Sequence, residues 1–290
     1  MQKCVKNTYG FYELAQKPTP EELQKYYSEK YYQENKGTYS GEYSSEEQKY
    51  FLNKIEQKLL LIKKKFHNNI KYSLLDVGCG EGFTLKYFYD IGWNVKGVDF
   101  NSFGCKTHNP EYVNKIITGD IYEVLQNIKL SGQGFDLIWL DNVLEHVLNP
   151  LDLLRLCFEL GNDISFLMIE VPNDFSVLQK KALELNLIDS EFWIAVPDHI
   201  SYFNKEGLKN ISKEAGWELE KLISDFPIDF NLFNENSNYV KDRSKGKAVH
   251  KQRYMLENLL HSISVEKVNK LYETLGDMGL GRQIIAVFKK

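Results

Sequence analysis

The fold of this chain is decided by Leu74-Leu75-Asp76-Val77-Gly78-Cys79-Gly80-Glu81-Gly82-Phe83. The apolar residues at its start predict a buried strand, and the residues after Phe83 predict a helix. Between them, glycines at alternate positions allow a tight turn and let a ligand approach the main chain without a Cβ in the way. The stretch therefore predicts a ligand-binding loop, with Gly78, Gly80 and Gly82 as candidate contacts.

Two acids follow at the ends of the next two predicted strands. Asp99 ends the apolar run 93–99 and lies 99 − 78 = 21 residues after Gly78. This spacing is typical of a strand-helix-strand unit whose acid accepts hydrogen bonds from both ribose hydroxyls of a nucleotide. Asp120 ends the third predicted strand, where it could accept a hydrogen bond from an adenine amino group. The pattern predicts an adenosine-containing cofactor.

The NAD fingerprint G-x-G-x-x-G would require a third glycine at position 83, which is Phe. Asp76 also precedes the loop directly, where it would repel a pyrophosphate but attract a cationic ligand. An adenosine that carries a cationic amino-acid tail therefore fits better than a dinucleotide. NAD stays as the alternative cofactor.

The motifs that carry a family resemblance are Asp76-Val77-Gly78-Cys79-Gly80-Glu81-Gly82, Gly97-Val98-Asp99 and Gly119-Asp120-Ile121. With them, residues 73–203 and the last strand resemble the class I S-adenosylmethionine-dependent methyltransferases. The resemblance implies that the glycine loop approaches the methionine part of the cofactor, that Asp99 holds the ribose and that Asp120 holds adenine. It also makes Phe100, Ile121 and Asp141 candidate cofactor contacts, and S-adenosylhomocysteine the product.

Strands and helices alternate from residue 70 onward. Strands are predicted at 72–77, 94–99, 114–118, 135–140, 164–171, 218–224 and 283–288, with helices between them. Such alternation predicts an α/β fold with a doubly wound, mostly parallel sheet and a ligand crevice at the carboxyl ends of its strands. The resemblance implies a Rossmann-like sheet of seven strands, the last antiparallel. Around this catalytic part (69–230 and 277–290) we expect an N-terminal helical cap or lid (1–68) and a helical insertion that caps the substrate (231–276).

The candidate catalytic residues are Glu145, His146 and His199. The run 140–150, with its Glu-His and Asn-Pro pairs, resembles the loop after the fourth strand of small-molecule methyltransferases, which implies a place beside the sulfonium and the acceptor. His146, with an ordinary pKa of about 6.5, suits the role of general base for a hydroxyl acceptor, or it holds the loop structurally. His199 is the rival base, and Asp198 either orients it or is only a neighbouring charge.

Candidate substrate contacts are polar residues outside these motifs. The stretch 241–253 has six positive and one negative side chain, a local charge of +5, which suits a phosphate-bearing substrate or is simply a solvated helix face. Asn173 could bind substrate or cap the following helix. The candidates are Tyr39, Tyr43, Asn173, Arg243, Arg253 and Arg282.

Composition narrows the class of protein. The chain has 290 residues, of which 43% are apolar and 26% charged, and a net charge of −4, which indicates a globular enzyme without an overall footprint for nucleic acid. Four cysteines without CxxC spacing indicate neither a metal site nor disulfides. Without a signal pattern or an apolar run of membrane-spanning length, we expect a cytoplasmic protein with no membrane span. The sequence leaves an oligomer open.

These features together predict methyl transfer to a small-molecule acceptor, anionic or nucleotide-linked. The ending Gly279-Leu280-Gly281-Arg282 resembles that of methyltransferases from bacterial surface-polysaccharide clusters, which implies a hydroxyl of a sugar or of a nucleotide-linked or phosphorylated precursor. A quinone or phenol O-methyltransferase, an NAD-dependent oxidoreductase and a non-catalytic cofactor-binding module remain the alternatives.

Overall fold

A central sheet of seven strands organises the computed structural model, which describes residues 3–29, 41–67 and 70–290. The strand order is β5-β4-β3-β6-β7-β10-β9, and β10 runs antiparallel to both neighbours while β3 to β7 pair in parallel. The predicted fold class is confirmed. The strands are β3 (Ser73–Val77), β4 (Asn94–Asp99), β5 (Ile116–Thr118), β6 (Phe135–Asp141), β7 (Gly161–Pro172), β9 (Glu218–Ser224) and β10 (Gln283–Lys289).

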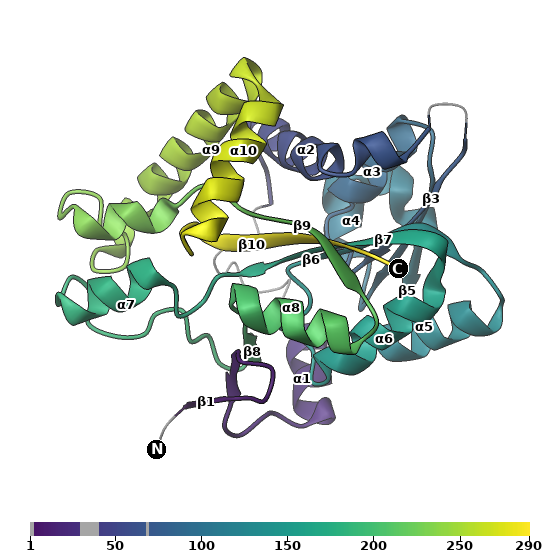
Figure 1. Cartoon of the computed structure of the whole chain (residues 1–290), viewed down its shortest axis with the longest axis horizontal. Helices are drawn as coiled ribbons and strands as arrows, with labels where there is room; N and C mark the ends of the chain where they lie inside the picture. Colours follow the sequence, from purple (N-terminus) through teal and green to yellow (C-terminus); the bar gives the residue numbers. More distant parts are fainter. Residues whose placement is uncertain (1–2, 30–40, 68–69) are drawn as a thin grey trace.

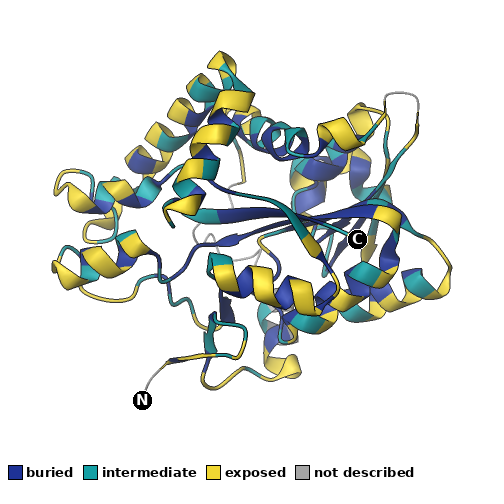
Figure 2. Ribbon diagram, viewed as in Figure 1, coloured by how far each residue is buried: buried dark blue, intermediate teal, exposed yellow. Residues whose placement is uncertain are grey.

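Helices cover both faces of this sheet (Figure 1). Successive residues of β3 show the division, because Leu74 packs in one apolar core and Leu75 in the other. The core of Leu74 is covered by α2 (Ser45–Leu60), α3 (Phe83–Asp90) and α10 (Val265–Asp277), and the core of Leu75 by α5 (Ile121–Leu130), α6 (Pro150–Leu160) and α8 (Lys205–Glu214). Figure 2 shows the buried residues gathered between these layers.

The remaining elements lie at the ends of the sheet or beside the helices. They are α4 (Phe103–His108), α7 (Val177–Glu184), α9 (Gly246–Ile263) and the 3-10 turns η1 (Lys63–Lys65), η2 (Pro110–Lys115), η3 (Ile228–Phe233) and η4 (Arg243–Lys245). The helix α9 packs along α2, so two helices about two hundred residues apart in the sequence lie side by side on one face of the sheet.

The N-terminal segment departs from the helical cap that the sequence predicted. It begins with β1 (Cys4–Lys6) and β2 (Tyr12–Leu14), which form a separate antiparallel sheet with β8 (Ser201–Tyr202). The first helix, α1 (Pro20–Glu29), follows these strands. Because β2 pairs with a strand almost two hundred residues away in the sequence, no local pattern indicates it. The consequence is that the N-terminus is fastened to the residues directly after His199.

The predicted insertion is part of the main body. Val268 and Tyr272 of α10 lie in the same core as Ile223 of β9 and Ile285 of β10, so this helix covers the sheet. A second apolar cluster joins the segment after β7 to η3, with Trp193 packed near Leu232. The residues between β7 and β8 therefore pack against η3 near the carboxyl end of β7.

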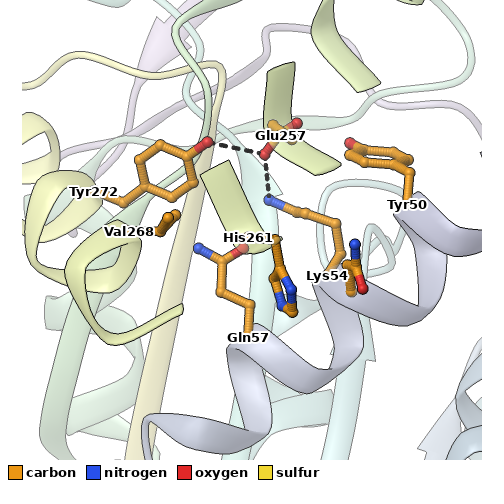
Figure 3. A pocket seen from close by; sticks show the side chains of 8 residues that line it. Tyr50, Lys54, Gln57, Glu257, His261, Val268 and Tyr272 are labelled. Carbon is orange, nitrogen blue, oxygen red and sulfur yellow. Dashed lines mark hydrogen bonds and ion pairs between the residues drawn. The ribbon is translucent and has the colours of Figure 1, made fainter. Parts of the chain in front are cut away.

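Buried ionic contacts fasten α9 and α10 to α2 (Figure 3). Glu257 accepts hydrogen bonds from Tyr272 (3.1 Å) and from Nε of Arg253 (3.0 Å), and Lys54 lies 3.5 Å from its carboxylate. Arg253 also forms an ion pair with Asp225, which is fully buried after β9. Such pairs stabilise only when complete, because a lone buried charge is costly.

Candidate active site

The glycine loop between β3 and α3 has the backbone that only glycine adopts readily. Gly78, Gly80 and Gly82 have φ angles of 72°, 48° and 78°, in the left-handed region that disfavours a Cβ. A Cβ at Gly78 would run into the Val143 side chain, and one at Gly82 would lie 2.7 Å from Sγ of Cys105. The three candidate glycines therefore form a tight cradle at the end of β3.

Asp99 supports this cradle from the end of β4. Its Oδ2 accepts a hydrogen bond from the Gly80 amide at 2.8 Å, and its Oδ1 accepts one from the Asn101 amide at 3.3 Å. The side chain is only 7% exposed, and burial raises the pKa of its carboxyl. The structure thus places Asp99 directly against the glycine loop, where the sequence predicted a ribose contact.

Asp76 is a buried acid in need of a counter-charge. It is 2% exposed, and within the described parts of the chain its Oδ2 has no hydrogen-bond partner. Burial, followed by the nearby Asp141 and Asp99 carboxylates, raises the pKa of Asp76 well above its ordinary value. A cationic ligand at this edge would stabilise the charged carboxylates. The residues therefore fit a sulfonium-bearing cofactor better than an anionic one.

Asp120 and Ile121 stand at the start of α5, beyond β5. The Asp120 side chain caps this helix, accepting hydrogen bonds from the amides of Tyr122 (2.9 Å) and Glu123 (3.1 Å). Its Oδ1 makes both of these bonds, so the carboxylate has a structural function whether or not it also contacts adenine. Ile121 is buried and Phe100, directly after β4, is half-buried.

Asp141, at the end of β6, pairs with a lysine that the sequence did not single out. Lys58 of α2 is 2% exposed and bridges the carboxylates of Asp141 and Glu170. In the sequence, a lysine on the apolar side of a helix cannot be distinguished from a solvent-exposed lysine. The role of Lys58 follows only from the packing of α2 over the ends of the strands. The bridge ties the N-terminal helix to the cofactor edge.

The side chains of Glu145, His146 and His199 lie close together. The sequence alone did not show whether they would meet. One ligand-type atom from each side chain lies within 4.8 Å of the others. The two imidazole rings meet edge to face, with centroids 4.9 Å apart. The backbone holds the two loops together, because the Glu145 carbonyl accepts hydrogen bonds from the amides of Ile200 (2.8 Å) and Ser201 (3.1 Å).

Asp198 contacts His146 more closely than it contacts His199, so it mainly orients His146. The carbonyl of Asp198 lies 2.8 Å from Nδ1 of His146 and its carboxylate 3.4 Å from the same atom, whereas His199 Nε2 is 4.0 Å from that carboxylate. Burial alone would lower the pKa of His146, but the charges of Glu145 and Asp198 raise it to about 9. Burial and the His146 charge lower the pKa of His199 to about 3. In this arrangement His146 is protonated at neutral pH and His199 is neutral.

Tyr43 contacts the glycine loop, whereas Tyr39 lies outside the described residues. The Tyr43 hydroxyl donates a 2.7 Å hydrogen bond to Glu81, and its ring centroid is 4.8 Å from that of His108. Burial raises the pKa of Glu81 to about 7. The segment before α2 therefore covers part of the loop, and Glu81 and His108 join a site in which the sequence prediction did not include them.

The remaining substrate candidates do not gather at one place. Arg253 is buried in the ion pairs with Asp225 and Glu257, so its prediction as a substrate contact is wrong. Arg243 is exposed in η4. The stretch 241–253 is thus a surface turn followed by a helix with one inward-facing arginine, and its charges do not form a single basic surface.

Asn173 and Arg282 lie at the carboxyl edge of β7. The Asn173 side-chain amide donates to the carbonyls of Gly279 (3.2 Å) and Gly281 (3.1 Å), which fixes the turn before β10. The alternative that it caps the next helix is wrong, because Ser176 caps α7. Arg282 donates to Asp174 at 3.0 Å with its side chain 20% exposed, so a positive group stands near the histidines.

Comparison with known proteins identifies the family. A sequence profile described as a methyltransferase domain matches residues 43–222, which is more than half of the chain and includes the glycine loop, the acids and all three converging side chains. The chain belongs to this family of methyltransferases. The predicted enzyme class is therefore confirmed. A search of curated proteins gave no significant match.

Solved structures agree with this methyltransferase in fold. A S-adenosylmethionine-dependent methyltransferase from Archaeoglobus fulgidus is 20% identical, with a TM-score of 0.51 over 82% of this chain and 94% of the other. The plantazolicin methyltransferase BpumL, in complex with S-adenosylhomocysteine, is 15% identical, with a TM-score of 0.51 over 92% and 93%. Among the described helices of the methyltransferase, none has the length and apolar character of a membrane span.

Proposed function

We propose that the methyltransferase transfers the methyl group of S-adenosylmethionine to a hydroxyl of a small anionic acceptor, a sugar or a nucleotide-linked or phosphorylated precursor of a bacterial surface polysaccharide. One observation carries this proposal. The glycine cradle with its acids and the cluster of Glu145, His146 and His199 lie at the same carboxyl edge of the sheet, after the neighbouring strands β3 and β6. Ligands of open α/β sheets bind at this edge.

The cofactor half of the site is assigned as follows. The loop from Gly78 to Gly82 admits the methionine part, Asp99 accepts hydrogen bonds from the ribose, and Asp120 lies towards the adenine. The buried carboxylate of Asp76 and the partly exposed carboxylate of Asp141 favour the positive charge of the bound cofactor. When bound, S-adenosylmethionine supplies a methyl group on a sulfonium, an electrophile that needs no further activation.

The acceptor half must align a hydroxyl oxygen, exclude water and provide for its proton. Asp198 holds the His146 ring in place, and Glu145 and His199 lie beside it. Burial raises the pKa of Glu145 to about 7, which suits a group that accepts a proton near neutral pH. Arg282, which pairs with Asp174 at 3.0 Å, contributes to the electrostatic environment of His199. This positive charge near the cluster favours an acceptor that carries a phosphate or carboxylate.

A second acceptor class is supported by aromatic side chains near His199. Phe175 stacks on Tyr12 with ring centroids 4.2 Å apart and meets Tyr202 edge-on at 6.1 Å, and Tyr202 is 6.3 Å from His199. Tyr202 is fully buried, but the half-buried rings of Phe175 and Tyr12 can stack with a planar ring. A phenol or quinol is therefore the second candidate.

The test is methyl transfer from labelled S-adenosylmethionine to panels of acceptors. We expect label in nucleotide sugars or sugar phosphates, and no transfer to the uncharged sugars that match them. Transfer only to phenols would favour the second candidate. Cofactor binding without transfer to either panel, or to a bacterial metabolite extract, would contradict catalysis and favour a binding module.

A further inference from the structure

Glu145 carries a carboxylate for which the protein provides little compensation. The residue is 1% exposed, and neither carboxylate oxygen has a hydrogen-bond partner within the described ranges of the chain. The nearest ion pair is to Nε2 of His146 at 3.8 Å. Burying a carboxylate without hydrogen bonds is costly. A bound cation would offset this cost.

The two histidines supply nitrogen atoms to the same point. His146 is held through Nδ1 by the carbonyl and carboxylate of Asp198, which directs Nε2 towards Glu145. Metal-binding histidines commonly have such an oxygen partner on the second ring nitrogen. His199 comes from the loop that the Glu145 carbonyl holds in place, so the three side chains are positioned by backbone contacts before any ligand arrives.

We propose that Glu145, His146 and His199 bind a divalent transition-metal cation beside the acceptor. Two imidazole nitrogens and one carboxylate oxygen suit zinc, manganese, iron or cobalt better than magnesium or calcium, which prefer oxygen ligands throughout. Three protein ligands leave coordination positions open for an acceptor oxygen. The sequence analysis predicted no metal, because the cysteines lack the spacing of a zinc site.

Binding requires the three side chains to move closer together. Ligand atoms of a tetrahedral site with bonds of about 2.1 Å lie about 3.4 Å apart, and the three atoms now lie within 4.8 Å of one another. Side-chain rotations that shift these atoms by up to about 1.4 Å close the difference. The Asp198 carboxylate, 3.4 Å from Nδ1 of His146, adds a second negative charge beside the cluster, which favours a bound cation.

The experiment measures cation binding without any acceptor. The chelator-treated full-length protein is titrated with Zn²⁺ by calorimetry and with Co²⁺ by visible absorption. We expect one cation per chain, lost in Glu145→Gln and in His199→Ala and retained in the control His250→Ala, whose histidine lies exposed on α9. Asp198→Asn should weaken binding about 10- to 100-fold, as for other second-layer partners of metal-binding histidines.

A measurement on the unaltered protein covers the case in which a variant fails to fold. Zn²⁺ should shift the imidazole ¹H–¹⁵N resonances of His146 and His199 and leave that of His250 unchanged. No binding to the wild-type protein, or unchanged binding in both ligand variants, would overturn the proposal. Since S-adenosylmethionine binding is measured separately, failure of this inference is distinguishable from failure of the proposed function.

Discussion

The substitution Gly78→Ala separates backbone strain from steric conflict at the cofactor loop. Gly78 has a φ of 72°, and a Cβ there would run into the buried side chain of Val143. Gly132 has a nearly identical φ of 74° with nothing within 4 Å of its Cβ position. Gly132→Ala therefore costs only the left-handed backbone, about 1 kcal/mol. Gly78→Ala adds overpacking of roughly 1–3 kcal/mol, for a total of about 2–4 kcal/mol.

Urea unfolding followed by circular dichroism measures both free energies of unfolding. In a protein that already carries Val143→Ala, the further substitution Gly78→Ala should lower the free energy of unfolding by only about 1 kcal/mol, because the conflicting methyl group is absent. Calorimetry with S-adenosylhomocysteine should show weaker binding for Gly78→Ala and unchanged binding for Gly132→Ala. Equal losses of stability for the two glycine variants, or no relief from Val143→Ala, would refute the reasoning.

Three further predictions concern buried charges. Lys58→Met should cost about 3–5 kcal/mol, because the buried Glu170 carboxylate and the partly exposed Asp141 carboxylate lose their shared cation. Lys129→Met, in an exposed pair with Glu159, should cost less than about 1 kcal/mol in urea unfolding. Arg253→Met should lower the free energy of unfolding by a similar amount, about 3–5 kcal/mol, and Arg243→Met by no more than about 0.5 kcal/mol. Equal losses in the two variants would contradict the buried ion pairs of Arg253. Asp76→Asn should stabilise the cofactor-free protein increasingly above about pH 4, because the folded state keeps this carboxyl protonated while the unfolded chain ionises it. If the variant exceeds the wild-type free energy of unfolding by the same amount at pH 5 and at pH 8, the raised pKa of Asp76 is contradicted.

Local patterns made the cofactor edge predictable from sequence. The strand before Gly78, the helix after it and the acid at position 99 are neighbours in sequence and in space, so periodicity and spacing suffice. The small sheet of β1, β2 and β8 depends instead on pairing between distant segments. No pattern near Tyr12 indicates a partner at Tyr202.

The charged residues show the same limit. Arg253 belongs to a basic stretch whose sequence pattern suggests a solvent-exposed helix face. Only the packing of α9 shows that Arg253 forms ion pairs with Asp225 and Glu257. The convergence of His146 with His199 likewise depends on backbone hydrogen bonds between two loops. Sequence patterns identified the residue types of the site, but tertiary packing decides which of them meet.

The most direct test of the account is calorimetric titration of the wild-type protein and Asp99→Ala with S-adenosylmethionine, S-adenosylhomocysteine and NAD. The account predicts that the wild-type protein binds the first two and not NAD. In Asp99→Ala, which removes the acid that holds the Gly80 amide and that we propose as the ribose contact, this binding should be lost or greatly weakened. Binding of NAD alone, or binding of S-adenosylmethionine that Asp99→Ala leaves unchanged, would contradict it.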